Sequence, residues 1–298
     1  MTPPCVCPKK HVVSRLAFLV LLACLPLSAQ ERVTAPRADG QNTPLLLYRP
    51  AISNRGCAPL AVISHGAGGS ENGYQYLAEA MAQAGYTTVV LGHRESGLTA
   101  LRADLRANGI KQGVRALVAD PNAEQARILD VGAALKWTNV QCHAPFRVLL
   151  GHSMGAVTVM LEAGAKNMIG TASPPAGQDR FDAYVALSPE GPGIVFPEHA
   201  WSGIRKPVLV LTGTRDQSLQ GGPEARQIPW HDMPGNVGHC QWMGVIDGAT
   251  HMNFAGNGFG ADRVEPKITE TIAEFLKGVR NHACVLPATT AGMTLQAK

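Results

Sequence analysis

Short apolar runs alternate with amphipathic stretches along most of this chain. Several runs are apolar at every position, which is typical of parallel strands covered by helices on both faces of a sheet. We predict strands, in chain order, at Thr43–Tyr48, Leu60–Ser64, Thr87–Leu91, Phe146–Leu150, Ala183–Leu187, Pro207–Leu211 and Trp242–Ile246, the last of which is expected to be the final strand.

Segments with helical periodicity separate these strands. Apolar side chains recur at intervals of three and four residues at Ile128, Val131, Ala134 and Leu135, as on one face of a helix. We predict helices at Glu71–Ala84, Ala123–Trp137, Met154–Ala163 and Pro266–Val279, and irregular helical pieces between Leu98 and Asn122. The β-α-β order predicts an α/β fold with a mostly parallel central sheet flanked by helices.

Length and composition fit one such domain. The chain has 298 residues, of which 45% are hydrophobic and 16% are charged, enough apolar material for a single covered sheet. The formal net charge is +4, and subtracting Lys9, Lys10 and Arg15 of the N-terminal segment leaves +1. No run of basic residues follows residue 30, so we expect no nucleic-acid partner.

The first 29 residues have the pattern of an export signal. Basic residues precede an apolar run of 12 residues, Leu16–Leu27, and the small residue Ala29 follows it. Such a run fits a signal peptide and is too short to span a bilayer, and no other segment has the length of a transmembrane span. We expect cleavage after Ala29, a single mature domain of residues 30–298, and a secreted or periplasmic location. A lipid anchor at Cys24 is the alternative.

The segment Gly151-His-Ser-Met-Gly155 matches the pattern G-x-S-x-G. A predicted strand runs directly into Gly151 and a predicted helix follows, so Ser153 lies on a sharp turn that exposes its hydroxyl. Side chains at the two glycine positions would collide with the neighbouring strand and helix. These features favour Ser153 as a nucleophile, and a serine that only caps the following helix is the alternative.

A nucleophilic serine needs a base within hydrogen-bond reach. In this type of fold an acid and then a histidine follow the serine along the chain. Asp216 comes after the strand ending at Leu211, and His251 comes after the strand ending at Ile246. Both are therefore expected at the carboxyl edge of the sheet, where open α/β sheets bind ligands.

Other acids and histidines compete for these roles. The competing acids are Asp232, Asp247 and Glu190, and the histidines near the same edge are His65, His93 and His152. Asp232 is interpreted as a surface charge and Asp247 as a turn residue. Among the histidines, His251 alone follows the acid in chain order. The sequence assigns no role to His93 or Glu190.

Backbone N–H groups must stabilise the negatively charged oxygen formed on attack. One donor is expected at Met154, directly after the serine. The second is expected at Ala67, in the glycine-rich loop after Leu60–Ser64. A phosphate-binding loop is the alternative, but neither G-x-x-x-x-G-K-[ST] nor G-x-G-x-x-G occurs there.

These motifs resemble the α/β-hydrolases known as predicted dienelactone hydrolases, which are related to the plasma-type platelet-activating-factor acetylhydrolases. The matching stretches lie within residues 40–280 and are Val62–Ser70, Gly151–Gly155, Leu187–Gly193, Val208–Asp216 and Asp247–Ala255. The resemblance implies the α/β-hydrolase fold and carboxylic-ester hydrolysis. It implies a triad of Ser153, Asp216 and His251, with Ala67 and Met154 as oxyanion donors. True dienelactone hydrolases carry a cysteine nucleophile, so the lactone name does not identify the substrate.

Four cysteines follow the N-terminal segment, and an even number in an exported chain favours two disulfides. In the α/β-hydrolase fold, Cys57 and Cys142 precede neighbouring parallel strands. Cys284 follows the closing helix, which runs antiparallel to the strand after Cys240. We therefore predict Cys57–Cys142 and Cys240–Cys284 at the amino edge of the sheet, with four free thiols as the alternative. We expect no zinc site.

The sequence favours a secreted serine carboxylesterase that forms an acyl-enzyme and uses no metal or organic cofactor. The expected substrate is a small-molecule or lipid-like ester, and a monomer is expected. The absence of an obvious large lid makes a lipase or a cutinase-type polyester hydrolase the alternative within the fold, and peptide hydrolysis ranks lower. A non-catalytic binding protein on the same scaffold is the alternative of a different class, but it would not need the complete set of site residues.

Overall fold

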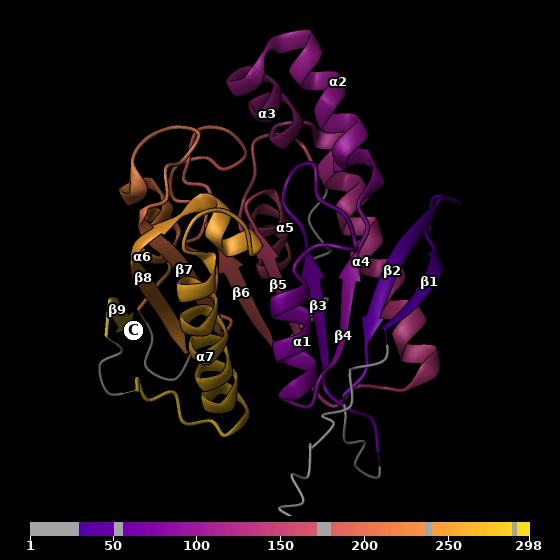
Figure 1. Ribbon diagram of the computed structural model, residues 1–298, viewed down its shortest axis with the longest axis vertical. Coiled ribbons are helices and arrows are strands. Elements are labelled where there is room, and N and C mark those ends of the chain that lie inside the picture. Colours follow the sequence, from indigo (N-terminus) through magenta and orange to yellow (C-terminus); the bar gives the residue numbers. More distant parts are fainter. Residues whose placement is uncertain (1–29, 51–55, 172–179, 236–239, 288–290) are drawn as a thin grey trace, which may run out of the picture.

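The computed structural model describes residues 30–50, 56–171, 180–235, 240–287 and 291–298. The described residues form one nine-stranded sheet in the order β1-β2-β4-β3-β5-β6-β7-β8-β9 (Figure 1). The strands are β1 (Gln30–Pro36), β2 (Asn42–Tyr48), β3 (Leu60–Ser64), β4 (Thr87–Leu91), β5 (Arg147–His152), β6 (Ala183–Leu187), β7 (Val208–Arg215), β8 (Gln241–Thr250) and β9 (Met293–Ala297). All seven predicted strands are therefore confirmed.

The six central strands, β4-β3-β5-β6-β7-β8, are parallel. The register between β3 and β5 pairs Ser64 with Gly151, and the register between β5 and β6 pairs His152 with Leu187. Strands β1 and β2 at one edge and β9 at the other are antiparallel to their neighbours. The expected mostly parallel sheet is confirmed.

The prediction that β8 is the final strand is wrong. Strand β9 returns after the closing helix and pairs antiparallel with β8, which places Met293 opposite Ile246. Only Met293 is buried in this edge strand. A strand with one buried residue lacks the apolar run by which the internal strands are recognised, and the exposed β1 lacks it for the same reason.

Helices lie between the strands. They are α1 (Gln75–Gln83), α2 (Leu98–Asn108), α3 (Ile110–Val118), α4 (Pro121–Gln141), α5 (Met154–Ala163), α6 (Ile228–Asp232) and α7 (Ala261–Arg280), with the short 3-10 helices η1 (Arg94–Ser96), η2 (Pro223–Arg226) and η3 (His251–Ala255). Helix α1 begins four residues later than predicted because Tyr74, with φ 58° and ψ 30°, is left-handed and cannot lie within an α-helix.

The helices cover both faces of the sheet, with α1 and α7 on one face and α4 and α5 on the other (Figure 1). Alternate residues of β3 show this division. Leu60 and Val62 pack in the core layer that contains α4 and α5, whereas Ala61 and Ile63 pack in the layer that contains α1 and α7. Because alternate side chains of a strand point to opposite faces, each central strand stabilises both layers.

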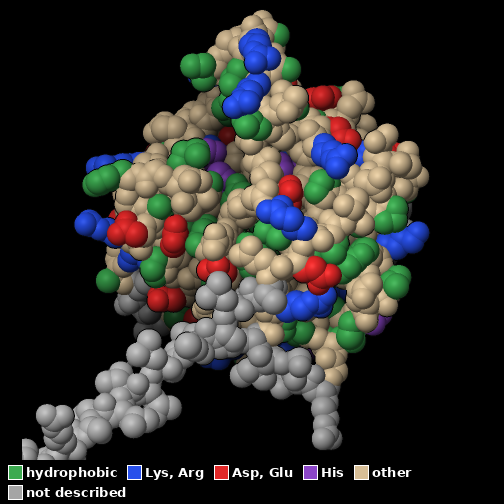
Figure 2. Space-filling model, turned by 45° about the vertical axis from the view of Figure 1, so that its right-hand side comes forward, with side chains coloured by type: hydrophobic (Ala, Val, Ile, Leu, Met, Phe, Trp, Pro, Cys, Tyr) green, Lys and Arg blue, Asp and Glu red, His purple; other side chains and the backbone are tan. Residues whose placement is uncertain are grey.

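Helices α2 and α3 form a hairpin that projects beyond the carboxyl edge of the sheet (Figure 1). They turn at Gly109, whose φ of 75° suits glycine. The prediction of irregular helical pieces here is wrong, because α2 and α3 are both regular α-helices. Helix α2 buries no residue and so lacks the apolar stripe that would have marked it. The hairpin carries exposed cationic side chains, including Arg102, Arg106 and Lys111, and Figure 2 shows lysine and arginine side chains on this projection.

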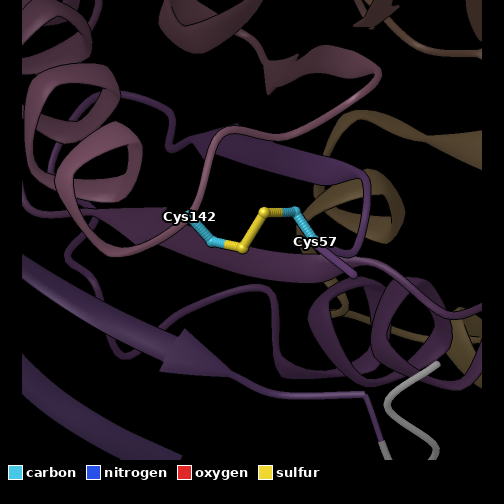
Figure 3. The surroundings of a disulfide bond; sticks show 2 residues. All are labelled: Cys57 and Cys142. Atoms are coloured by element: carbon cyan, nitrogen blue, oxygen red, sulfur yellow. A yellow bond between two sulfur atoms is a disulfide. The ribbon is translucent and has the colours of Figure 1, made fainter. Parts of the chain in front are cut away.

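Both predicted disulfides are present. Cys57 bonds to Cys142 with a Cα–Cα distance of 5.6 Å (Figure 3), and Cys240 bonds to Cys284 with a Cα–Cα distance of 5.3 Å. They close loops with sequence separations of 85 and 44 residues. Chain-entropy arguments give each crosslink about 4 kcal/mol of stabilisation through its effect on the unfolded state.

The predicted export signal, residues 1–29, lies outside the described residues. Within the described ranges, no helix is both long enough and apolar enough to cross a membrane.

Candidate active site

Ser153 lies on the sharp turn between β5 and α5. Its backbone is strained, with φ 55° and ψ −119°, in a region that residues with a Cβ seldom adopt. The flanking glycines make the turn possible. A Cβ at Gly155 would collide with the carbonyl of Ser64, and a Cβ at Gly151 would collide with the carbonyl of Gly155. The close approach of α5 to β3 therefore requires glycine at position 155, and the close approach of α5 to β5 requires glycine at position 151.

His251 follows directly after β8, and its imidazole contacts the serine. Ser153 Oγ lies 3.0 Å from His251 Nε2, within donating distance of that nitrogen. The start of η3 fixes the backbone here, because Thr250 and Asn253 form a capping box. The histidine side chain is about one-third exposed, at 31%. Its Nε2 edge is thus held toward the serine while part of the ring is accessible.

Asp216 follows β7 and approaches the other imidazole nitrogen. Its Oδ1 atom lies 3.1 Å from His251 Nδ1, and its Oδ2 atom accepts a hydrogen bond from Thr212 Oγ at 2.9 Å. Burial of Asp216 acts to raise its pKa. Hydrogen bonding to His251 and the positive charge of Arg226 outweigh burial, so the pKa is lowered. The carboxylate is therefore held ionised beside the imidazole.

The competing acids lie elsewhere or contact other groups. Asp232 accepts a hydrogen bond from the Trp201 backbone N–H at 2.8 Å and lies 3.0 Å from His199. Asp247 is exposed. Glu190 lies near the site, but its Oε1 atom pairs with Arg226 at 2.6 Å. The structure thus brings Asp216 to His251, as predicted from the chain order.

Two residues that the sequence analysis missed also contact the acid and the imidazole. Ser188, at the end of β6, donates a hydrogen bond to Asp216 Oδ1 at 2.9 Å, and its Oγ lies 2.7 Å from His251 Nδ1. Arg226, in η2, places Nε 3.2 Å from Asp216 Oδ1 and Nη2 3.2 Å from His251 Nδ1. The position of Ser188 at a parallel strand end was a usable signal, whereas nothing in the local sequence marks Arg226.

The glycine-rich loop after β3 lies beside the nucleophile and is held by hydrogen bonds on both sides of Ala67. The Gly66 N–H donates to Tyr74 Oη at 3.0 Å, and the Gly68 N–H donates to the Ser96 carbonyl at 2.8 Å. Within the described ranges, neither the Ala67 N–H nor the Met154 N–H donates a hydrogen bond to a protein acceptor. Both predicted oxyanion donors therefore have a free N–H.

His152 supports the site from the strand side. Its Nε2 lies 3.0 Å from the His251 carbonyl, its Nδ1 lies 2.8 Å from Tyr74 Oη, and its ring centroid lies 4.6 Å from that of His251. Burial, together with the nearby His251, holds the pKa of His152 well below its usual value. A neutral His152 thus packs beneath His251.

His65 and His93 belong to a buried polar cluster behind the glycine-rich loop. The His93 N–H donates to His65 Nε2 at 3.1 Å, while His93 Nδ1 lies 2.8 Å from Asp130 Oδ2. Arg127 donates to Ser64 Oγ at 3.0 Å and to the His65 carbonyl. The cluster therefore ties α4 to the end of β3, which answers the open question about His93.

Among the described residues, no three His, Cys, Asp or Glu side chains lie where they could together hold a metal ion.

This arrangement can be compared with known proteins. Residues 58–172, less than half of the chain, match the model of a family described as serine aminopeptidase, S33. No curated protein sequence matches the chain.

Several solved structures are similar. The Pyrococcus furiosus esterase Pf2001 has a TM-score of 0.54 and 17% identity over 84% of this chain and 92% of that one. The thermophilic esterase Est2 of Thermogutta terrifontis has a TM-score of 0.57 and 17% identity over 89% of this chain and 97% of that one. A prolyl endopeptidase has a TM-score of 0.55 and 15% identity over 85% of this chain but only 39% of its own length.

Sheet order, helix layers and these likenesses define the class of fold. The chain has the α/β-hydrolase fold, with a mostly parallel central sheet and flanking helices. The narrower resemblance to the dienelactone hydrolase group stays a prediction.

Proposed function

We propose that this protein is a serine hydrolase that cleaves carboxylic esters, with Ser153 as nucleophile, His251 as general base and Asp216 as the acid that orients the imidazole. One observation carries the proposal. Ser153 Oγ lies 3.0 Å from His251 Nε2, and His251 Nδ1 lies 3.1 Å from Asp216 Oδ1, with the serine on a strained turn. A non-catalytic descendant would have no need of this strain.

The proposed reaction has two halves. Ser153 Oγ attacks the ester carbonyl carbon while His251 Nε2 takes the hydroxyl proton. The tetrahedral intermediate collapses, the bond to the alcohol oxygen breaks, and His251 returns the proton to the leaving alcohol. A water molecule then gives its proton to His251 and attacks the acyl-enzyme, which releases the carboxylic acid and restores Ser153. Asp216 stabilises the imidazolium formed in each half.

The backbone N–H groups of Ala67 and Met154 are the proposed oxyanion donors. Their supporting feature is that both are free of protein acceptors while the residues around Ala67 are fixed by hydrogen bonds. Preorganised donors of this kind need no reorganisation when charge develops on the substrate oxygen, which is why they lower the barrier.

The proposed location is outside the cytosol. Two disulfides are stable in oxidising compartments, which supports export. A small-molecule or lipid-like ester is the proposed substrate, with lipase or polyester hydrolysis as a narrower version of the same activity. The similar esterases support the ester class.

A second candidate is peptide-bond hydrolysis by the same three residues. The family description names an aminopeptidase, and one similar structure is a prolyl endopeptidase. The two functions differ in the leaving group, because an amine must be protonated before it can depart. A matched pair of acyl nitrophenyl ester and acyl nitroanilide substrates separates the two functions.

The test uses the purified mature protein with nitrophenyl esters of graded acyl length and the matched anilides. We expect turnover of esters well above that of anilides, and covalent labelling of Ser153 by a fluorophosphonate probe, mapped by mass spectrometry. The variant Ser202→Ala, which changes an exposed serine, is the labelling control. Labelling at another serine, or anilides cleaved faster than esters, would overturn the proposal.

A further inference from the structure

Behind the candidate triad lies a buried arrangement of three charged side chains: Asp216, Arg226 and Glu190. Asp216 is completely buried, Arg226 is 1% exposed and Glu190 is 3% exposed. The guanidinium lies between the two carboxylates, with Nε 3.2 Å from Asp216 Oδ1 and Nη1 2.6 Å from Glu190 Oε1. Each member comes from a different segment of the carboxyl edge.

The positive charge of Arg226 is unfavourable at this position in a serine hydrolase unless a negative charge compensates it. Its Nη2 lies 3.2 Å from His251 Nδ1, the nitrogen that must carry a proton if Nε2 is to accept from Ser153. Arginine only donates, so these two nitrogens cannot hydrogen-bond in that tautomer. The guanidinium instead donates from Nη2 to the Gln217 carbonyl at 2.6 Å. Toward the imidazole it acts as a positive charge.

A positive charge at this place opposes catalysis. The imidazolium that forms during attack is stabilised by Asp216, and a lone guanidinium beside that carboxylate would cancel the negative charge of the pair. Glu190 supplies the missing charge. With Glu190 present, two carboxylates and one guanidinium leave one net negative charge next to His251.

We infer that Glu190 and Arg226 are charge-balancing positioning residues, and that Glu190 keeps the negative charge of Asp216 available to His251. This inference rests on the proposed function. Arg226 in turn holds the segment that follows β6 in place, because its Nη1 also donates to the carbonyls of Ser188 and Pro189 at 3.1 and 3.2 Å. Glu190 acts through Asp216 and need not touch the substrate.

Within the described part of the chain, the charged or titratable side chains that contact His251 are those of Asp216 after β7, Arg226 in η2 and His152 at the end of β5. Glu190, after β6, contacts Arg226. Burial keeps His152 uncharged at neutral pH, so it adds nothing to this balance. The sign of the field at His251 therefore depends on the Asp216, Arg226 and Glu190 charges.

Glu190→Gln removes one charge with little other change. The glutamine oxygen can keep the hydrogen bonds that Oε1 accepts from Arg226 and from the Leu219 N–H. The Oε2 atom accepts no hydrogen bond from the described residues, so the amide nitrogen at that position breaks none. The variant tests charge while preserving shape.

The experiment measures kcat/KM against pH for an ester substrate. In Glu190→Gln the imidazolium loses a stabilising charge. Because this loss lowers the pKa of His251, we expect the acidic limb of the kcat/KM profile to move to lower pH by about one unit. The plateau kcat should fall about tenfold, with KM little changed. The double variant E190Q/R226Q removes both charges of the outer pair and should move the limb back and recover most of kcat. A merely structural role for Glu190 predicts the opposite, since the double variant would then be worse than the single one.

Two controls keep the result decisive. Arg226→Lys retains the positive charge, so the acidic limb of its pH profile should stay in place even if its rate falls. If the double variant does not fold, the comparison of E190Q with R226K still tests the role of charge. Glu162→Gln removes a different buried carboxylate, which pairs with Arg180 and lies at the end of α5 farther from Ser153. This variant should leave the acidic limb in place. An unshifted limb in Glu190→Gln, or no recovery in a folded double variant, would overturn the inference. If the wild-type protein shows no hydrolase activity, the proposed function itself is rejected.

Discussion

The Nε2 atom of His251 lies 3.0 Å from the Oγ atom of Ser153, although 98 positions separate the two residues in the sequence. Two parallel strands, β5 and β8, deliver them to the same edge of the sheet. The contact is direct, so the proposed base is in place to take the hydroxyl proton. This geometry leads to several measurable expectations.

Ser153→Ala should abolish ester turnover without unfolding the protein. The side chain is only half-buried, and alanine fits the space of serine. Loss of the nucleophile should lower kcat by at least about 10³-fold, leaving only the catalysis that binding and the oxyanion donors provide. Steady-state kinetics and a thermal melt check both parts. Full esterase activity in a folded alanine variant would exclude the assignment.

Asp216→Asn should lower kcat by about 10³- to 10⁴-fold, because His251 loses the carboxylate that fixes its tautomer and stabilises its charge. Asp247→Asn, at an exposed position on β8, is the matched control and should leave turnover unchanged. If Glu190→Gln is the more damaging substitution and Asp216→Asn is mild, the triad acid lies after β6 and not after β7.

Ser188→Ala should lower kcat by about 10- to 100-fold, a smaller loss than that of the triad residues. Its hydroxyl donates to Asp216 and lies against His251 Nδ1, and a hydrogen bond to a charged group typically contributes 1.5–3 kcal/mol. Ser188→Thr retains a hydroxyl but adds a β-branch at a residue with φ 54°, so it is expected to destabilise the fold. A Ser188→Ala variant with wild-type kcat would show that Asp216 orients the imidazole unaided.

Glu124→Gln should change how stability depends on pH. Burial raises the pKa of Glu124 from 4.5 to about 7, against the opposing charge of Arg127. Because the folded pKa is raised, this group stabilises the fold fully below pH 4.5, and that stabilisation is lost as the pH rises toward 7. The loss amounts to about 3 kcal/mol by linkage.

The measurement is denaturant unfolding of both proteins at pH 4.5 and pH 8. The free energy of unfolding of Glu124→Gln relative to wild type should rise between these pH values. The raised pKa of the buried Asp130, about 6, acts in the same direction in both proteins and cancels in the comparison. A constant difference between the two proteins would mean that the pKa of Glu124 is the same in the folded and the unfolded protein.

The double variant Cys57→Ser/Cys142→Ser should lower the free energy of unfolding by about 4 kcal/mol while leaving ester turnover at low temperature close to wild type. The disulfide lies at the amino edge of the sheet, at the opposite end of the strands from Ser153. Non-reducing peptide mapping of the exported protein checks the pairing first. Recovery of a Cys57–Cys240 peptide would contradict it, and four alkylatable thiols would mean that neither bond forms.

Local patterns determined much of this protein. Runs of apolar residues identified all seven covered strands, because a strand that is buried on both faces must be apolar at nearly every position. The glycines around Ser153 marked the strained turn, and the ends of β7 and β8 placed Asp216 and His251 at one edge. The cysteine pairing followed from the strand order and from the direction of the closing helix in the α/β-hydrolase fold. Each of these features depends on a few neighbouring residues or on the order of parallel strands.

The tertiary structure alone decided the rest. Edge strands β1 and β9 are mostly exposed and lack an apolar run, and α2 buries no residue, so no periodic signal marked these elements. Arg226 reaches Asp216 and Glu190 from the short helix η2, which contacts β7 and is bonded through Arg226 to the residues that follow β6. A charge becomes important to the triad only when burial removes the water that would screen it, and burial depends on the folded chain as a whole.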